Sequence, residues 1–211
     1  MKKLLGVLML LFVTSAAAAW DTIPDRRFPA VLSVGDSISL HYLSELSTRL
    51  IGKYTVSHIA ANARSSNYVR AHIDGVWTRG YTPDIILLNC GIHDLTLVNG
   101  MLQVSLYDYE INLRQIVTKV HNLSWHPKLI WVRTTPVSDT MQKYRLNSDV
   151  ILYNATADRV MQELGVPIID VYTPMAGNIN KLTIDGVHPN EAGERIIAAT
   201  ITARIGEIMA Q

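Results

Sequence analysis

Residues 30–37 read Ala-Val-Leu-Ser-Val-Gly-Asp-Ser, and this stretch decides the fold class. Five small or apolar residues in succession, without alternation of polar and apolar positions, are typical of a strand buried on both faces. The glycine and the two polar residues that follow end the strand abruptly. A strand covered on both sides belongs to a sheet that lies between two layers of helices.

Beyond this stretch, the chain alternates between apolar strands and amphipathic helices. Four more strands are predicted, at residues 54–59, 85–88, 129–132 and 166–171. Apolar residues recur at helical spacing in residues 39–50, 106–123, 150–164 and 191–209. Right-handed crossovers then give an α/β fold, a three-layer α/β/α sandwich around a five-stranded parallel sheet. No repeat or long linker interrupts residues 20–211, which are predicted to form a single domain.

The composition excludes several classes of protein. The chain has 211 residues, of which 48% are hydrophobic and 18% charged, so neither a disordered chain nor a coiled coil is expected. The 19 Lys and Arg residues against 18 Asp and Glu residues give a net charge of +1, too balanced for attraction to nucleic acid. Cys90 is the single cysteine, so no intramolecular disulfide can form.

Residues 1–19 have the layout of a secretory signal peptide. Lys2 and Lys3 precede the apolar run 4–13, and the small residues 16–19 provide an A-x-A cleavage site. An uncleaved membrane anchor is the alternative, but about ten apolar residues are too few to span a bilayer. We therefore expect removal of residues 1–19, export to the periplasm or the medium, and no stable membrane insertion.

Four polar segments follow predicted strands or precede the last helix. They are residues 35–39 (GDSIS), 62–65 (NARS), 91–94 (GIHD) and 185–189 (DGVHP). In an open parallel sheet, the functional site lies beyond the carboxyl ends of the strands. The four segments are therefore expected to meet at one edge of the sheet.

Ser37, Asp185 and His188 are the candidate nucleophile, orienting acid and base. A serine hydroxyl becomes a good nucleophile only where a base takes its proton and a third group orients that base. The D-x-x-H spacing lets Asp185 accept from Nδ1 of His188, which leaves Nε2 free to face Ser37. The alternatives are structural: Ser37 or Ser39 could cap a helix, and residues 185–189 could form a surface loop.

A metal site is a further alternative for the same segments. His93, Asp94, Asp185 and His188 are of residue types that bind metal ions. The sequence has neither an H-E-x-x-H motif nor a paired-carboxylate spacing, and no metal is predicted.

With these residues in this order, the chain resembles the SGNH (GDSL-type) hydrolases over residues 20–211. The resemblance rests on Gly35-Asp36-Ser37 near the start and Asp185-Gly186-Val187-His188-Pro189 near the end. It implies a flavodoxin-like sandwich in which Ser37 is the nucleophile, His188 the general base and acid, and Asp185 its orienting group. It also implies a reaction without a metal or an organic cofactor.

Two positions depart from the family's pattern, and both concern the oxyanion hole. The glycine usual in the second motif is Ala63 here, and its backbone N–H is expected to join that of Ser37 as a donor. The third motif usually reads G-x-N-D, whereas this chain has His93 at the asparagine position. The His93 ring is expected to donate in place of the amide, with Asp94 fixing its tautomer. Alternatively, His93 is a structural residue of the core.

The substrate is less well specified by the sequence. The loop at residues 63–68 is most similar to that of rhamnogalacturonan acetylesterases, which read A-G-R-S there. This similarity favours an esterase that removes a short acyl group, acetyl first, from a carbohydrate or similar small ester. A lysophospholipase or thioesterase, or a catalytically silent binding module, is the alternative. The polar loop 139–147, with Lys143 and Arg145, is either a solvated loop or a contact for an anionic substrate.

Overall fold

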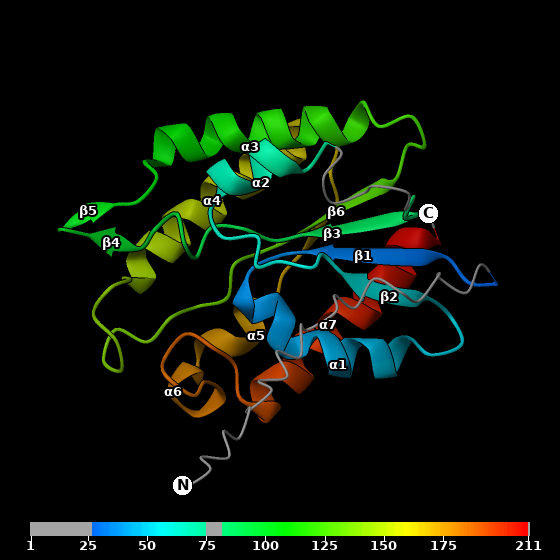
Figure 1. Ribbon diagram of the computed structural model, residues 1–211. Coiled ribbons are helices and arrows are strands. Elements are labelled where there is room, and N and C mark those ends of the chain that lie inside the picture. The colour runs from blue at the N-terminus through cyan, green and yellow to red at the C-terminus, as the bar shows by residue number, and fades with distance from the viewer. Residues whose placement is uncertain (1–26, 75–81, 211) are drawn as a thin grey trace, which may run out of the picture.

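The computed structural model describes residues 27–74 and 82–210, which form three layers with a sheet in the middle (Figure 1). The sheet has five parallel strands in the order β2-β1-β3-β6-β7, the flavodoxin-like arrangement. The strands are β1 Ala30–Val34, β2 Thr55–His58, β3 Ile85–Leu88, β6 Lys128–Val132 and β7 Ile168–Ile169. The predicted fold class and strand number are confirmed.

Helices cover both faces of this sheet (Figure 1). One face carries α1 Ser37–Leu50, α5 Thr173–Ala176, α6 Ile179–Leu182 and α7 Glu191–Met209. The other carries α2 Ser66–His72, α3 Leu106–His121 and α4 Asn147–Glu163. A two-stranded antiparallel hairpin, β4 Leu97–Val98 and β5 Met101–Leu102, lies between β3 and α3 in the sequence.

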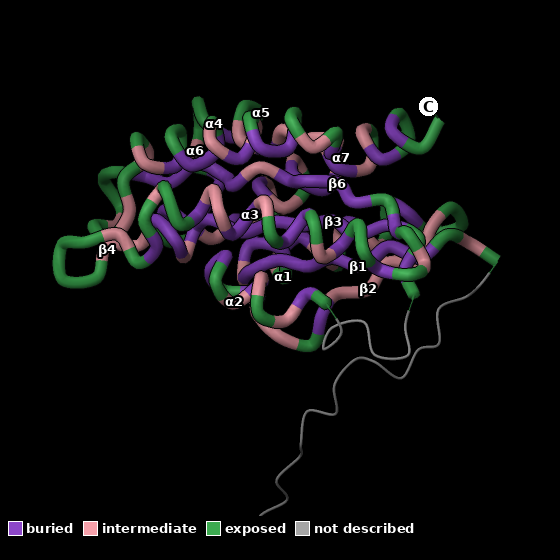
Figure 2. The backbone as a smooth tube through the Cα atoms, turned by 90° about the horizontal axis from the view of Figure 1, so that it is seen from above, coloured by how far each residue is buried: buried purple, intermediate pink, exposed green. Residues whose placement is uncertain are grey.

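The core follows from the apolar patterns. Figure 2 shows β1, β3 and β6 as a largely buried layer, the edge strand β2 as intermediate, and exposed residues on the outer sides of the helices. Every residue of β1 and β3 is buried. The long helices bury one apolar side each, as Ile197, Ile201 and Ile205 do on α7. Burial on both faces explains why these strands have no polar alternation.

Two predicted boundaries are corrected. The strand expected over residues 166–171 is only Ile168–Ile169, because the edge strand pairs with β6 through these two residues alone. The helix expected to begin at residue 39 begins at Ser37, because the Asp36 side chain accepts the N–H of Ile38 and so caps the helix.

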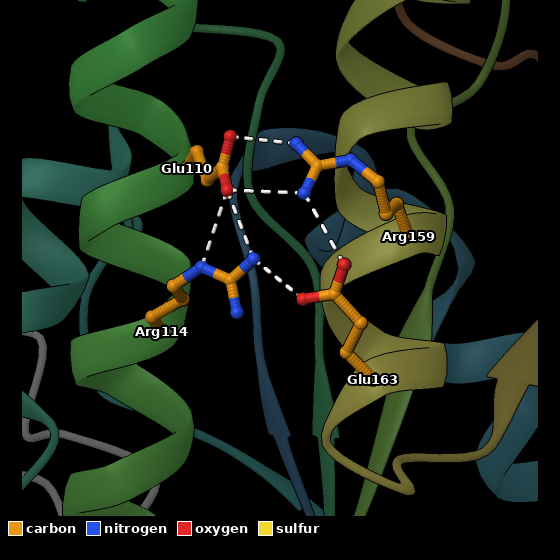
Figure 3. A network of polar contacts seen from close by, with 4 residues as sticks. All are labelled: Glu110, Arg114, Arg159 and Glu163. Atoms are coloured by element: carbon orange, nitrogen blue, oxygen red, sulfur yellow. Dashed lines mark hydrogen bonds and ion pairs between the residues drawn. The ribbon is translucent and has the colours of Figure 1, made fainter.

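An ion-pair network joins α3 to α4 on the surface of the molecule (Figure 3). Glu110 pairs with Arg114 on its own helix and with Arg159 on α4, while Glu163 contacts both arginines. Hydrogen bonds from Arg159 and Arg114 lower the pKa of Glu110 to about 2. Exposed pairs of this kind stabilise a protein only weakly, and the network mainly fixes which faces of the two helices meet.

The predicted signal peptide lies outside the described residues. Within residues 27–74 and 82–210, no helix is long and apolar enough to cross a membrane.

Candidate active site

Ser37 lies at the sheet's carboxyl edge, after the interior strand β1. Strand β1 pairs with β2 on one side and β3 on the other, and Ser37 is the first residue of the helix that follows. In the first turn its own N–H has no intrahelical acceptor. The helix is capped by Asp36, and neither serine supplies the cap. The Ser39 hydroxyl instead contacts the Asp36 carbonyl and Nε2 of His58, each at 2.6 Å.

The structure brings Ser37 to His188 across 151 positions of sequence. The Ser37 Oγ lies 2.9 Å from Nε2 of His188, and Nδ1 of His188 lies 2.7 Å from Oδ2 of Asp185. An ionised carboxylate only accepts hydrogen bonds, so Nδ1 carries the ring proton and Nε2 is free to accept from Ser37. These contacts are those that the sequence predicts.

The loop before α7 holds Asp185 in its ionised form. Desolvation raises the pKa of Asp185, but hydrogen bonds from the His188 N–H, the His188 ring and the Val187 N–H together lower it by more. The resulting pKa is about 2, below the usual value for an aspartate. Gly186 turns the loop at a φ of +85°, and its carbonyl accepts from Ser138 at 2.8 Å. The imidazole is therefore oriented by a carboxylate that remains charged at any neutral or mildly acidic pH.

Comparison of the sequence with models of protein families identifies the family to which these residues belong. The GDSL-like lipase/acylhydrolase family matches residues 33–196, a range that includes Ser37, Asp185 and His188. The chain belongs to this family. It is therefore an ester hydrolase, and no curated protein matches it closely enough to add to that assignment.

Solved structures of other hydrolases share the fold. A putative GDSL-like lipase from Parabacteroides merdae has a TM-score of 0.71 at 16% identity, over 84% of this chain and 95% of its own. The acetyl xylan esterase AlAXEase has a TM-score of 0.71 at 16% identity, over 83% and 99%. Axe2, an acetylxylan esterase from Geobacillus stearothermophilus, has a TM-score of 0.70 at 18% identity, over 84% and 94%. At identities this low, the TM-scores show that these proteins share the fold, and they show no more than that.

The expected oxyanion contact of Ala63 is corrected. The Ala63 N–H donates to the carbonyl of Gly35 at 2.9 Å, so the hydrolase already uses it inside the protein. This bond ties the loop after β2 to the residue after β1, beyond the bond from the Ile59 N–H to the Ser33 carbonyl with which the pairing of the two strands ends. The positive φ of the loop, 54°, falls one residue later, at Arg64.

His93 lies at the same edge, after β3, and is half-buried. Its ring has no hydrogen-bond partner within the described part of the chain. Burial lowers the pKa of His93, and the nearby charges of Arg145, His188 and Arg64 lower it further. The ring is therefore neutral near pH 7, and a neutral imidazole keeps one N–H to donate.

Asp94 does not orient His93, contrary to the prediction. Its carboxylate is fully buried and accepts the N–H of Ser66 at 2.9 and 3.0 Å, together with the Ser66 hydroxyl. Asn112 on α3 also donates to the Ser66 hydroxyl. Asp94 therefore joins the loop after β3 to the start of α2 and to α3.

Two residues near the nucleophile, His41 and Asp36, were given no role from the sequence, whereas Arg145 was considered as a contact for an anionic substrate. The His41 ring lies 5.3 Å from the His188 ring and its Nδ1 is 3.4 Å from Glu194. Its spacing of four from Ser37 places both on one side of α1, which was a usable signal. Burial raises the pKa of Asp36 to about 6, and Arg145 is near enough for its charge to oppose that shift. Nothing in the local sequence of Arg145 indicates this proximity.

The described residues contain no cluster of side chains that would support the alternative of a metal site. Across residues 27–74 and 82–210, no three His, Cys, Asp or Glu side chains are grouped so that they could hold a metal ion. His93, Asp94, Asp185 and His188 do not form such a group, because Asp94 points to Ser66 and Asp185 to His188.

Proposed function

We propose that this hydrolase is an exported serine esterase that removes short acyl groups, acetyl first, from a carbohydrate or similar small ester. The chain of contacts from Ser37 through His188 to Asp185 is the observation that carries the proposal. It supplies a nucleophile, a base and an orienting carboxylate in the geometry that acyl transfer requires.

The reaction proceeds in two halves. Ser37 Oγ attacks the ester carbonyl carbon while His188 Nε2 takes its proton, and the carbonyl oxygen becomes an oxyanion. The Ser37 N–H and the His93 ring N–H are the donors available to that oxygen. The carbon–oxygen bond to the alcohol then breaks as His188 returns the proton to the leaving alcohol. Water, deprotonated by His188, then attacks the acyl carbonyl carbon. The bond from that carbon to Ser37 Oγ breaks as His188 returns the proton to Oγ, which releases the acid and free Ser37.

The short acyl group and the carbohydrate are supported by two likenesses. The loop at residues 63–68 resembles that of rhamnogalacturonan acetylesterases, and acetyl xylan esterases are among the structures that share the fold. Both likenesses are to enzymes that act on acetylated polysaccharides. Export is supported by the signal-peptide layout of residues 1–19.

A lysophospholipase or thioesterase is the second candidate, and one surface feature favours it. The hairpin β4–β5 exposes Val98 and Met101, and it is joined to the exposed Tyr144 through a hydrogen bond from the Leu97 N–H to the Tyr144 carbonyl. These apolar side chains would suit a longer acyl chain.

A chain-length series of p-nitrophenyl esters tests the proposal on residues 20–211. Rates that peak at two to four acyl carbons support the short-chain esterase, and a peak at eight or more supports the second candidate. Ser37→Ala and His188→Ala are each expected to lower kcat on the order of 10⁴-fold or more. A fluorophosphonate should label Ser37 covalently. Absence of both hydrolysis and labelling would instead indicate a silent binding module.

A further inference from the structure

The arginines of the described residues differ in their partners. Six are ion-paired with Asp or Glu: Arg49, Arg114, Arg133, Arg159, Arg195 and Arg204. Arg64 and Arg145 have no acidic partner within residues 27–74 and 82–210. Both are close enough to His93 for their charges to act on it. Arg70 also has no ion pair among the described residues, but its Nη1 donates to Gln115. Arg64 and Arg145 are therefore set apart by their position near His93, at the edge of the sheet that carries Ser37.

Arg145 is held in place by contacts that leave the end of its side chain free. Its Nε donates to the Ile92 carbonyl at 2.9 Å, directly before His93. Gln142 fixes the backbone on both sides, because its Oε1 accepts the Arg145 N–H at 2.9 Å and its Nε2 donates to the Arg145 carbonyl at 2.6 Å. The two Nη groups have no acceptor among the described residues. A guanidinium presents these donors as a planar fork that fits a carboxylate or phosphate.

Arg64 adds a second positive charge near His93. It is exposed, and the left-handed backbone at its position is stabilised by its N–H, which donates to Asn62 Oδ1 at 2.8 Å. Its guanidinium lies 5.1 Å from the centre of the Tyr68 ring. This stacking orients the side chain while leaving its donors available.

Resting on the proposed function, we infer that Arg145, assisted by Arg64, binds a carboxylate on the alcohol part of the ester, so that the substrate is an acetylated acidic sugar. An acetyl group has no room for a second anionic group, and therefore the anion must belong to the alcohol. Arg145 is half-buried, and its Nη donors have no acceptor among the described residues, so they are free to donate to a bound carboxylate.

Another role for Arg145 makes a different prediction. Its charge also acts on Asp36 and Asp185, so it could serve only to balance these carboxylates. In that case, loss of the charge would slow charged and neutral substrates equally. A carboxylate subsite instead requires that the ratio between the two substrates change.

The test uses two acetylated methyl glycosides that differ only in charge. One carries the carboxylate of a hexuronic acid and the other the uncharged uronamide. The wild-type enzyme is expected to prefer the acid by about 10- to 100-fold in kcat/KM. Arg145→Gln should reduce that ratio to near one, chiefly through KM for the acid, and Arg64→Gln should reduce it by a smaller factor. Arg204→Gln, which removes a distant ion-paired arginine, is the control and should keep the wild-type ratio.

Each result separates this inference from the function on which it rests. Equal kcat/KM for acid and amide in the wild type, or a preference that survives Arg145→Gln, overturns the inference while p-nitrophenyl acetate hydrolysis upholds the esterase. Failure on that neutral acetate as well overturns the proposed function. Acetylated glycerol 3-phosphate forms a third arm, and a tenfold higher kcat/KM on it than on the acid overturns the choice of a carboxylate in favour of phosphate.

Discussion

His93 is half-buried beside Ser37, yet its ring has no hydrogen-bond partner among the described residues. A neutral imidazole keeps one N–H, and an N–H without a partner in the described protein is free to donate to a transition state. Since the Ala63 N–H is already bound to Gly35, the imidazole is the side-chain donor available to an oxyanion. His93 is therefore expected to take the role that an asparagine has in the usual third motif of the family.

His93→Ala is therefore expected to lower kcat by about 10²- to 10³-fold, the usual effect of losing one oxyanion donor. His93→Asn, whose amide also donates an N–H, should recover at least tenfold of that loss. Both are measured as kcat and KM on p-nitrophenyl acetate. His121→Ala, at the exposed end of α3, is the control. A wild-type kcat in His93→Ala would leave the triad intact and remove His93 from the mechanism.

Asp94 gives a pH-dependence of stability whose sign is fixed by its burial. Desolvation raises the pKa of Asp94 to about 7, even though the Ser66 hydroxyl and N–H oppose the shift. The folded state therefore keeps a proton that the unfolded chain loses near pH 4, so the stability it gives is present at low pH and lost as pH rises to 7. Relative to Asp94→Asn, the wild type should lose on the order of 3 kcal/mol in unfolding free energy between pH 4 and pH 7.5.

Urea unfolding at several pH values measures this difference. Asp74→Asn is the matched control, because Asp74 is exposed beside Lys119 and its pKa is lowered from the usual value. Its difference from the wild type should stay constant between pH 5 and pH 8. Parallel curves for the wild type and Asp94→Asn would show that Asp94 does not titrate in this range.

Site residues could be predicted from the sequence where a local motif surrounds them. They could not be predicted where their role depends on a partner that is distant in the sequence. Ser37 and His188 were predictable because a local motif surrounds each and the topology of a parallel sheet puts both at one edge. Asp94 was misassigned because its partner, Ser66, is 28 positions away and belongs to a helix without a clear pattern. The bond from Ala63 to Gly35 likewise joins residues 28 positions apart, which no local pattern reveals.

At the scale of elements, the loop before α7 depends on Gly186. This residue has a φ of +85°, and a Cβ there would lie 2.8 Å from the Met141 Cβ and 3.0 Å from the Ser138 Cβ. Gly186→Ala therefore adds a clash to the cost of a left-handed backbone, which is roughly 1–2 kcal/mol for a residue with a side chain. Because Gly186 lies between Asp185 and His188, a shift of the loop that relieves the clash also displaces these two residues, and kcat/KM is expected to fall at least tenfold.

Gly165→Ala separates the clash from the backbone cost. Gly165 also has a positive φ, 68°, but its Cβ would meet nothing within 4 Å, and it follows α4. This variant should lose about 1 kcal/mol of stability and keep kcat/KM within about twofold. Equal kcat/KM in both variants would mean that the loop tolerates displacement. Thermal unfolding together with kinetics on one short ester distinguishes the two cases.

Element length explains which parts of the fold were predictable. Helices α3 and α7 repeat their apolar spacing over four turns or more, and the pattern places them within a few residues. Helices α5 and α6 have four residues each, and the hairpin strands β4 and β5 have two each, too few for any period to appear. These short elements are stabilised by contacts with the rest of the fold.

At the scale of the molecule, the site exists because the two ends of the described chain pack together. Helices α1 and α7 lie side by side on one face of the sheet (Figure 1), which brings the loop before α7 over the first turn of α1. A pair of residues 151 positions apart is thereby held at 2.9 Å. Formation of the complete site therefore requires the whole domain, and a deletion of α7 would remove activity together with the fold.

The same view gives a prediction for residues 1–19, which precede every described element. The buried core of the described residues runs from Ala30 to Ile208, so a chain that begins at Trp20 should fold and match the full-length protein in kcat/KM, with a Tm within about 2 °C.

The full chain, expressed with an export pathway, should be recovered from the periplasm or medium with Trp20 as its first residue, identified by mass spectrometry. Leu8→Arg interrupts the apolar run and should leave the unprocessed chain inside the cell. Exported protein that still begins at Met1 would contradict cleavage, and wild type retained in the cytoplasm would contradict export altogether.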